Sequence, residues 1–596
     1  MHAPPSRHPN SRLLRLYTLL KGDSVLFSAT VCSGLCLVGA TGLLLLHHWV
    51  FPHVFEPFAS WVRVLSGGRA INAVGIKHLN KASVAAEQLT ILLITFILLP
   101  YWALMYALRQ YLPLQSSKPI KSSHPIQGKV WLLPILILAL LVRLRWMGRG
   151  LGNDEIYASM HFIDGKTLWG TVSTYMMFNN HIAYSLAARF SQEILGRHEW
   201  VLRLPSLLLG LSTVALSFYA AQRYLPLIGA AMTAICLAIS PTGVLYDCSA
   251  RGYAGMMFFV LVSSDHFLKL VRKPSRRLLV GYILATSAAI YFHLYASLVV
   301  IVQFVLLLGA ALWQIFVGGN RASMGWQVVR PLFLAFPIIT GVAVFCYSPV
   351  LVQLVENIFS SGKGTFNLTF PLTVFTMLSG GVPHLIAVMM LALVFFGLRS
   401  LSRIDPLAAI YIGLLFLGPL LTIWLLRPFF LFPRFFVFLL PYFLMLLNIG
   451  LHEFCRVSSL PRFMPKGGNY LATAAIVVSL IFAWAPKCWH VGRDGFREAA
   501  ELLESGSAKN VLFCALGEDC TNFQYYSRQS LYIPSSVAEW EENVRRFSEV
   551  RCAYYPVVGY QPAAHTAIAG FLEANSEVHR IENIVVFVWR RSSDVP

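Results

Sequence analysis

The stretch KVWLLPILILALLVRLRWMGRGLGNDE, residues 129–155, contains the two features on which the predicted fold rests. Its opening segment, 129–147, is an apolar run close to the ~20 residues that a helix needs to cross the hydrocarbon core of a bilayer. In lipid such a run must be helical, because each backbone polar group has to be satisfied within its own segment. The stretch ends in two adjacent carboxylates, Asp154 and Glu155. We therefore expect a membrane-spanning helix followed by an acidic loop at one membrane face.

Apolar runs of the same kind recur along the chain. Of its 596 residues, 57% are hydrophobic and 12% are charged, whereas soluble domains carry about 25% charged residues. This deficit of charge excludes a soluble protein. The runs predict an all-α polytopic membrane protein with about 13 transmembrane helices, at 25–50, 88–108, 129–147, 202–222, 226–245, 253–271, 278–296, 297–318, 331–353, 383–398, 407–426, 434–452 and 469–485.

The net charge of +20 makes a nucleic-acid partner the first alternative to consider. However, the Lys and Arg residues lie mostly in short connectors between apolar runs, where the positive-inside rule and anionic lipid headgroups place them. We therefore expect membrane lipid, and no nucleic acid, as a partner. With a cytoplasmic N-terminus the basic connectors on the inside are Lys118/Lys121, Arg272/Lys273/Arg276/Arg277, Arg321/Arg330, Arg399/Arg403 and Arg456/Arg462/Lys466. The segment 51–88 departs from this pattern, because it would lie outside with several basic residues.

Two long segments fall on the outer side in this arrangement. The first, 148–200, carries acidic, aromatic and His residues, and the second, 486–596, loses the apolar bias. We therefore expect three regions: a basic N-terminal segment with two extra helices at 1–128, a transmembrane catalytic module at 129–485, and a small α/β soluble domain at 486–596. The sequence shows no evident retention signal, which favours the bacterial inner membrane, with the C-terminal domain in the periplasm.

The C-terminal region has a soluble pattern of helices and strands. Short buried strands are predicted at 511–516 and 584–589, and a helix capped by Asp494 would bury a face made by Phe496, Ala499, Ala500 and Leu503. Ser536 and Glu539 have the spacing of a capping box. Cys514 and Cys520 could form a disulfide in an oxidising compartment, and the sequence leaves that question open.

The acidic pair Asp154-Glu155 is the sharpest chemical signal. Adjacent carboxylates at the exit of a membrane helix are costly near hydrocarbon unless they are solvated or paired. Aromatic, amide and imidazole side chains follow the pair, including Asn180, His181 and Tyr184, and such groups suit a sugar site at the membrane surface. The alternatives are a loop of solvated acids and an interfacial aromatic belt.

Two further polar signals fall at the same membrane face. Asp247, Arg251 and Tyr253 lie in a very short outer loop, and Arg434 lies at an outer edge between two long runs. A guanidinium there can bind a phosphate in bidentate fashion. The alternatives are an Asp247–Arg251 ion pair and an Arg434 that snorkels to lipid headgroups.

The convergence of acids and arginines at one face predicts an enzyme whose donor is a lipid with a phosphate head. Arginine would hold the phosphate leaving group, and a carboxylate would deprotonate the acceptor hydroxyl. No Gly-rich phosphate cradle is present, so no nucleotide is expected. The sequence shows no clear set of metal ligands and leaves a divalent cation open.

These motifs resemble the GT-C class of membrane glycosyltransferases, in particular the branch of protein O-mannosyltransferases and lipid A aminoarabinose transferases. The matching segments, in chain order, are Asp154-Glu155, Asn180-His181-Ile182-Ala183, Trp200-Val201-Leu202-Arg203-Leu204-Pro205-Ser206, Ser240-Pro241 with Tyr246 and Ala250-Arg251-Gly252-Tyr253, and Arg434-Phe435. The order and spacing match over roughly 129–300 and more loosely beyond. The chain departs from the family where Ile182 and Ala183 replace prolines and where Ser249 replaces an acidic residue.

The resemblance implies an inverting transfer from a polyprenyl-phosphate sugar to a glycan, lipid or protein acceptor. By this resemblance, Asp154 is the general base of the transfer, with Glu155 beside it. Arg251 and Arg434 bind the phosphate of the donor. The further candidates for substrate binding are Asn180, His181, Tyr184, Asp247 and Tyr253.

Two other classes of function compete with this one. A transporter or flippase for a lipid-linked or anionic substrate often has paired repeats with broken helices, and the sequence shows no such pairing. A non-catalytic membrane scaffold would leave the convergence of acids and arginines unexplained.

Overall fold

The structure is a computed structural model, and it describes residues 129–175, 179–316, 326–360, 369–426, 431–457, 480, 482–484, 495–505, 510–517, 520–556 and 562–591. Several predictions lie outside these residues. They are the N-terminal segment at 1–128 with its helices at 25–50 and 88–108, the cap at Asp494, most of the run at 469–485, and the connectors Lys118/Lys121, Arg321 and Arg462/Lys466.

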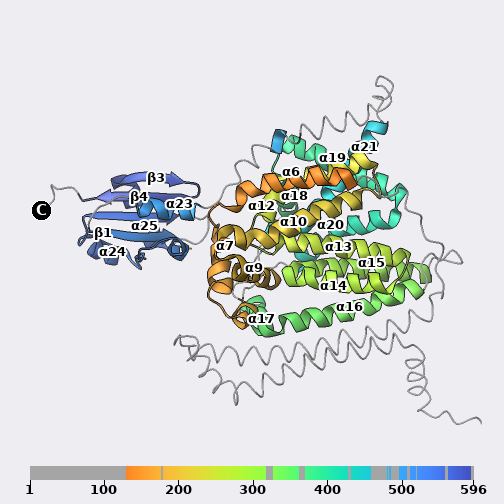
Figure 1. The fold of residues 1–596 in the computed structure, drawn as a ribbon, viewed down its shortest axis with the longest axis horizontal. Helices are drawn as coiled ribbons and strands as arrows, with labels where there is room; N and C mark the ends of the chain where they lie inside the picture. The colour runs from red at the N-terminus through yellow and green to blue at the C-terminus, as the bar shows by residue number, and fades with distance from the viewer. Residues whose placement is uncertain are drawn as a thin grey trace, which may run out of the picture.

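The membrane region is a bundle of long apolar helices (Figure 1). Eight described helices are long and apolar enough to cross a membrane. They lie in α6 (Lys129–Met147), α10 (Glu199–Ala221), α13 (Tyr253–Arg272), η4–α15 (Leu294–Ala296, Ser297–Phe316), α16–η6 (Trp326–Tyr347, Ser348–Val350), α19 (His384–Ile404), α20 (Pro406–Leu426) and η7–α21 (Pro433–Leu439, Leu440–Val457). The chain is therefore an integral membrane protein, as predicted.

Two further apolar runs give shorter or broken helices. The run predicted at 226–245 forms α11 (Leu227–Ile239) and α12 (Pro241–Asp247), bent by 59°. The break follows from Pro241, which is well suited to the first position of a helix, and from Ser240, whose hydroxyl caps α12 by accepting from the Gly243 amide. The run predicted at 278–296 forms α14 (Arg276–Phe292), which has 17 residues.

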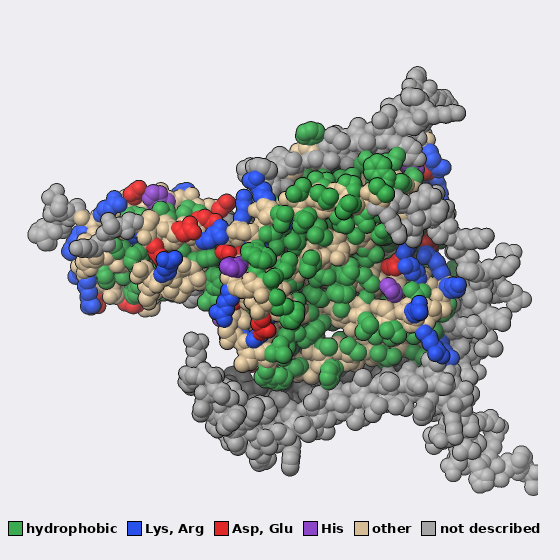
Figure 2. All heavy atoms as spheres, viewed as in Figure 1, with side chains coloured by type: hydrophobic (Ala, Val, Ile, Leu, Met, Phe, Trp, Pro, Cys, Tyr) green, Lys and Arg blue, Asp and Glu red, His purple; other side chains and the backbone are tan. Residues whose placement is uncertain are grey.

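The surface of the bundle is apolar where it faces lipid. Figure 2 shows hydrophobic side chains over the helical region, whereas charged side chains gather at its ends and over the C-terminal region. Large exposed apolar residues on this surface include Trp131, Leu133, Leu385, Phe395 and Leu417. The distribution is that of a membrane-embedded bundle with polar ends.

Shorter elements cover the end of the bundle that carries the acidic loop. They are α7 (Asn153–Ala158), the short π-helix η3 (Ser159–Ile163), α8 (Leu168–Ser173), α9 (Ile182–Leu195), α17 (Leu351–Ser360) and α18 (Phe370–Leu378).

The C-terminal region forms a four-stranded sheet with helices, hereafter the sheet unit, defined as residues 495–591. Its strands are β1 (Val511–Gly517), β2 (Glu549–Tyr555), β3 (Glu577–Ile581) and β4 (Ile584–Arg590), in the order β1-β2-β4-β3. β1 and β2 are parallel, and the other two pairs are antiparallel. The helical elements are α23 (Phe496–Leu503), η9 (Cys520–Tyr525), α24 (Val537–Val544) and α25 (Ala563–Asn575).

Both predicted strands and the apolar helix face are confirmed in the sheet unit. Phe496, Ala499, Ala500 and Leu503 are all buried on α23. Gly495 occupies the N-cap of α23 with a φ of 84°, a left-handed conformation that favours glycine. Ser536 caps α24 as predicted, but the Glu539 carboxylate accepts from the Ser535 amide instead of completing the box. Cys514 is a free buried thiol, so the disulfide with Cys520 is not formed.

The sheet unit shares a hydrophobic core with the acidic loop of the bundle, residues 148–200. Leu151, Ile156 and Phe162 from the loop belong to the same buried cluster as Phe496 and Val586 from the sheet unit. In Figure 1 the sheet unit accordingly lies at one end of the bundle, beside α7. The bundle and the sheet unit are therefore packed together through apolar contacts.

Glycine permits the close contact between α19 and α21. A Cβ on Gly397 would lie 2.0 Å from the Leu446 carbonyl oxygen, and a Cβ on Gly450 would lie 1.9 Å from the Leu393 carbonyl oxygen. Both are impossible distances to backbone atoms, so neither position accepts a side chain unless the helices separate.

We predict that Gly397→Ala lowers the free energy of unfolding by about 1–3 kcal/mol, the usual cost of overpacking. Thermal unfolding in detergent, followed by near-UV circular dichroism, measures this effect. Gly309→Ala is the matched control, because a Cβ there meets no described atom within 4 Å and alanine is the better helix former by about 1 kcal/mol. Equal stability of the two variants would contradict the tight helix contact.

Candidate active site

A cavity of about 330 Å³ opens where the acidic loop, the loop before α13 and the start of η7 meet. Its lining consists of Gly152, Asn153, Asp154, Glu155, Leu245, Tyr246, Cys248, Ser249, Arg251, Tyr253, Arg434 and Tyr555. The three segments that the sequence singled out therefore lie together, although they are far apart in the chain.

Asp154 faces both arginines in this cavity. Its Oδ2 lies 3.0 Å from Nη1 of Arg434 and 3.9 Å from Nη1 of Arg251. Arg251 also donates to the Asp154 backbone carbonyl over 3.1 Å. The Asp154 side chain is 36% exposed, so its carboxylate is open to a molecule that enters the cavity.

Glu155 has a different environment from its neighbour. Its Oε1 and Oε2 accept from Nε and Nη2 of Arg203 over 3.0 and 2.6 Å, in a bidentate pair with Arg203 fully buried. Oε1 also accepts from the Ala250 amide over 2.5 Å, and Oε2 accepts from the Gly152 amide over 2.8 Å. With each oxygen bonded twice, Glu155 is placed to hold the site together, and we assign it a positioning role.

Arg203 extends this network to the end of α6. It donates to the carbonyl oxygens of Met147, Arg149 and Gly150. One ion pair thus joins α10, the end of α6, the N-terminus of α7 and the residue that precedes Arg251. The Trp-x-x-Arg segment contained this arginine, but no local pattern connected it with Glu155.

Asp247 is not part of the cavity lining. Its ion-pair partner is Arg143, whereas the partner considered from the sequence was Arg251. Asp247 accepts from Nε and Nη2 of Arg143 on α6 over 2.9 and 2.6 Å. Both side chains are at most 1% exposed. The Asp247–Arg251 pair is not formed, because α12 turns Asp247 into the bundle. Arg143 is one of two arginines, with Arg145, in the apolar run of α6. Charged residues inside a bundle usually pair, but nothing in the sequence singled out Arg143 as this partner.

Asn180, His181 and Tyr184 also lie outside the cavity lining, in the support behind it. Asn180 donates to the carbonyls of Thr171 and Thr174 over 2.9 and 2.7 Å. Tyr184 donates to the Leu202 carbonyl over 2.6 Å. These bonds hold α8, α9 and α10 against one another at the end of the bundle.

His181 and His293 pack with Tyr253 beneath the arginines. Their ring centroids lie 4.8 Å apart, and each lies 5.2 Å from the ring of Tyr253. The Nδ1 of His181 faces the Phe292 carbonyl, whereas the Nδ1 of His293 accepts from the Tyr295 amide. Because a carbonyl only accepts and an amide only donates, the neutral rings carry their protons on different nitrogens.

Arg251 and Arg434 each have an N–H group for which the described residues offer no hydrogen-bond acceptor. Nε of Arg251 and Nε of Arg434 are buried without a hydrogen-bond partner among the described residues. The guanidinium of Arg434 is stacked on Phe432, with its Cζ 4.3 Å from the ring centroid. Buried donors normally find acceptors, so the site is suited to an anion with several acceptor oxygens.

Polar contacts join the sheet unit to the acidic loop. Tyr526 accepts from the Leu151 amide over 2.6 Å, Asn522 donates to Asn153, and Arg497 pairs with Glu199 over 3.2 Å. Burial raises the pKa of Tyr525 to about 12 and also raises the pKa of Tyr526, so both phenols stay protonated. No sequence signal pointed to Tyr555, the residue by which this unit reaches the cavity.

The described residues of the chain contain no group of three or more His, Cys, Asp or Glu side chains placed to hold a metal ion. The carboxylates of the cavity lining are those of Asp154 and Glu155, and the second of these is bonded to Arg203.

Residues 182–320 match the family model described as dolichyl-phosphate-mannose-protein mannosyltransferase. The match begins directly after His181 and includes Arg203 and Arg251. It confirms that the chain resembles the GT-C glycosyltransferases, a class of membrane transferases. No curated protein matches the chain in sequence.

Three solved structures of membrane transferases are similar to this chain over most of its length. ArnT from Cupriavidus metallidurans, bound to undecaprenyl phosphate, is 15% identical and has a TM-score of 0.49, over 79% of this chain and 100% of that one. The oligosaccharyltransferase of Archaeoglobus fulgidus, tethered to an acceptor peptide, is 10% identical with a TM-score of 0.41, over 71% and 69%. The arabinosyltransferase EmbB of Mycobacterium smegmatis is 12% identical with a TM-score of 0.35, over 68% and 45%.

The different environments of the two carboxylates predict different effects of amide substitution. Glu155→Gln should lower the free energy of unfolding by about 3–5 kcal/mol, because it leaves the buried Arg203 without a charged partner. Asp154→Asn should lower it by about 1 kcal/mol or less, because the ion pair that it removes with Arg434 is partly exposed. Thermal unfolding of the two purified variants, beside wild type, compares them. A Glu155→Gln protein of wild-type stability would show that the ion pair does not hold the site together.

Proposed function

We propose that the protein transfers a sugar from a polyprenyl-phosphate donor to an acceptor hydroxyl at the outer face of the membrane, with inversion at the sugar carbon. The observation that carries this proposal is the cavity in which two arginines flank one accessible carboxylate. The family match supports a glycosyl transfer, whereas the donor, the acceptor and the membrane face are our inference from the site.

The arginines are suited to the phosphate of the donor. Guanidinium groups bind phosphate oxygens through parallel N–H donors, and Arg251 and Arg434 both keep a buried Nε without an acceptor among the described groups. The same interaction stabilises polyprenyl phosphate as a leaving group, because negative charge develops on its oxygen as the bond to the sugar breaks.

Asp154 is the candidate general base. It would take the proton of the acceptor hydroxyl while the acceptor oxygen attacks the anomeric carbon and the bond from that carbon to the phosphate oxygen breaks. The electron pair leaves with the phosphate. In the structure Asp154 pairs with Arg434, so a phosphate bound by Arg434 would compete for that guanidinium and release the carboxylate. This arrangement would couple activation of the base to binding of the donor.

Helix polarity supports an outer, non-cytoplasmic position for the cavity. α13 runs from Tyr253 in the cavity to Arg272 at its far end, and η7–α21 runs from Arg434 to Arg456. The basic ends lie where the positive-inside rule expects cytoplasm. We therefore infer that the cavity and the sheet unit face the periplasm of a bacterial inner membrane, with residues 129–485 as the catalytic module.

Transfer from radiolabelled polyprenyl-phosphate sugars to a membrane extract tests the proposal. Asp154→Asn should lower the rate by about 10²–10⁴-fold, the usual contribution of a general base, with stability retained. Wild-type rates in this variant would exclude Asp154 as the base. No transfer by wild type from any donor would favour the transporter alternative.

The phosphate assignment makes a second prediction. Arg434→Lys keeps the charge but loses the planar fork of donors, so it should weaken binding of undecaprenyl phosphate about tenfold or more, the effect of losing ~1.4 kcal/mol. Arg546→Lys, at an exposed pair with Glu542 on the sheet unit, is the control and should bind as wild type does. Titration with undecaprenyl phosphate in detergent, read by intrinsic fluorescence, measures both. Equal affinity of the two variants would contradict the assignment.

A further inference from the structure

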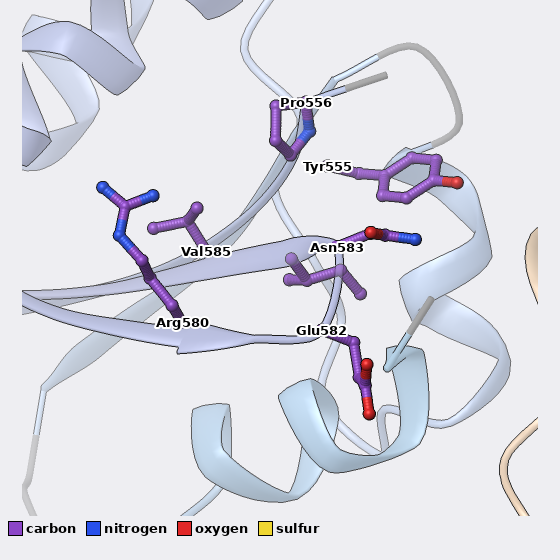
Figure 3. Close-up of a pocket in the computed structure, with 7 residues that line it drawn as sticks. Tyr555, Pro556, Arg580, Glu582, Asn583 and Val585 are labelled. Atoms are coloured by element: carbon purple, nitrogen blue, oxygen red, sulfur yellow. The ribbon is translucent and has the colours of Figure 1, made fainter. Parts of the chain in front are cut away.

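The sheet unit has a second cavity that borders the candidate active site. Its volume is about 430 Å³, and its polar wall comes from Tyr555, Arg580, Glu582 and Asn583. Tyr555 also lines the cavity that contains Asp154. Figure 3 shows the side chains of Tyr555 and Asn583 extending in the same direction, beside each other. The two cavities are therefore neighbours with one shared side chain between them.

Packing holds this second cavity at a fixed distance from the acidic loop. The turn between β3 and β4, which carries Glu582, rests on Gly495 at the start of α23, where an added Cβ would lie 3.0 Å from the Ile581 carbonyl. Arg497 on α23 in turn donates to the Gly148 carbonyl over 3.1 Å. Tyr555 is held by the ring of Phe496, at a centroid distance of 5.1 Å. A molecule bound here would keep a constant position relative to Asp154.

The lining chemistry matches a molecule with many hydroxyl groups. A hydroxyl both donates and accepts, and the wall offers a carboxylate acceptor on Glu582, an amide on Asn583 and guanidinium donors on Arg580. One of those donors pairs with Glu573 over 2.7 Å. The aromatic ring of Tyr555 adds an apolar face suited to the C–H face of a sugar ring. Charges of both signs, on exposed side chains, favour neither a lipid tail nor a polyanion.

We propose that the sheet unit binds a glycan acceptor in this second cavity and presents one of its hydroxyls past Tyr555 to Asp154. This inference rests on the proposed function, and it names the substrate class on the acceptor side. Tyr555 is then an acceptor-binding residue at the junction. Asn583, Glu582 and Arg580 bind sugar units farther from the reacting hydroxyl.

Saturation-transfer NMR on the full chain in lipid nanodiscs tests this acceptor site, with maltotriose, chitotriose and a Ser/Thr-containing hexapeptide as probes. We expect saturation transfer to at least one oligosaccharide from wild type, reduced threefold or more in Asn583→Ala and Tyr555→Ala. Arg546→Ala, on the exposed face of the sheet unit beyond α24, should match wild type. Should Tyr555→Ala fail to fold, Asn583→Ala decides the outcome, and Tyr555→Phe, which keeps the aromatic ring, should retain the saturation transfer of wild type. Transfer only to the peptide, to no probe, or equally in all variants would overturn the glycan assignment.

Binding of undecaprenyl phosphate to the same samples separates this inference from the proposed function. Asn583→Ala should bind the lipid as wild type does, because Asn583 lies in the second cavity only. Loss of lipid binding in Asn583→Ala would show a general disruption and overturn the inference. If Arg434→Lys leaves lipid binding intact while Asn583→Ala loses the oligosaccharide, the donor assignment fails and the glycan site stands.

Discussion

The buried ion pair between Glu155 and Arg203 is the interaction on which the site depends. A buried pair is a poor source of stability, because desolvation offsets most of the attraction. Its value here is geometric, since one carboxylate and one guanidinium bond to backbone groups from the end of α6, the start of α7 and the loop before α13. Asp154 and Arg251 each lie next to a residue that this pair fixes in place. The position of the Asp154 carboxylate thus depends on the hydrogen bonds that its neighbour Glu155 makes.

The apolar runs predicted the bundle well, because the requirement that a helix cross the bilayer leaves little freedom in the sequence. The strands at 511–516 and 584–589 were also predictable, since their apolar runs are short and bounded by polar residues. Pairing between side chains that are distant in the sequence was not predictable. Nothing local in the sequence distinguishes Arg143 from Arg251 as the partner of Asp247, which lies at the end of α12, after the bend at Pro241.

The candidate active site shows the same limit of prediction from sequence. The sequence indicated that Asp154, Arg251 and Arg434 share a membrane face, and the structure places them within ion-pair distance. It also treated Asn180, His181 and Tyr184 as one group with them, because proximity along the chain cannot separate the lining of a cavity from the layer that supports it. Tyr555 could not be predicted as a site residue for the opposite reason. Its neighbours in sequence belong to a strand of the sheet unit, and only tertiary packing brings it to the cavity.

The core shared by the acidic loop and the sheet unit has a consequence for biogenesis. Leu151 and Phe162 emerge early in synthesis, but their apolar partners Phe496 and Val586 are translated only near the end of the chain. The apolar side chains of the loop therefore stay uncovered until the last segment has been translated and folded. A chain that lacks the sheet unit would leave this core open and would also lack Tyr555 in the lining of the cavity, so the cavity is completed only when the end of the chain has folded.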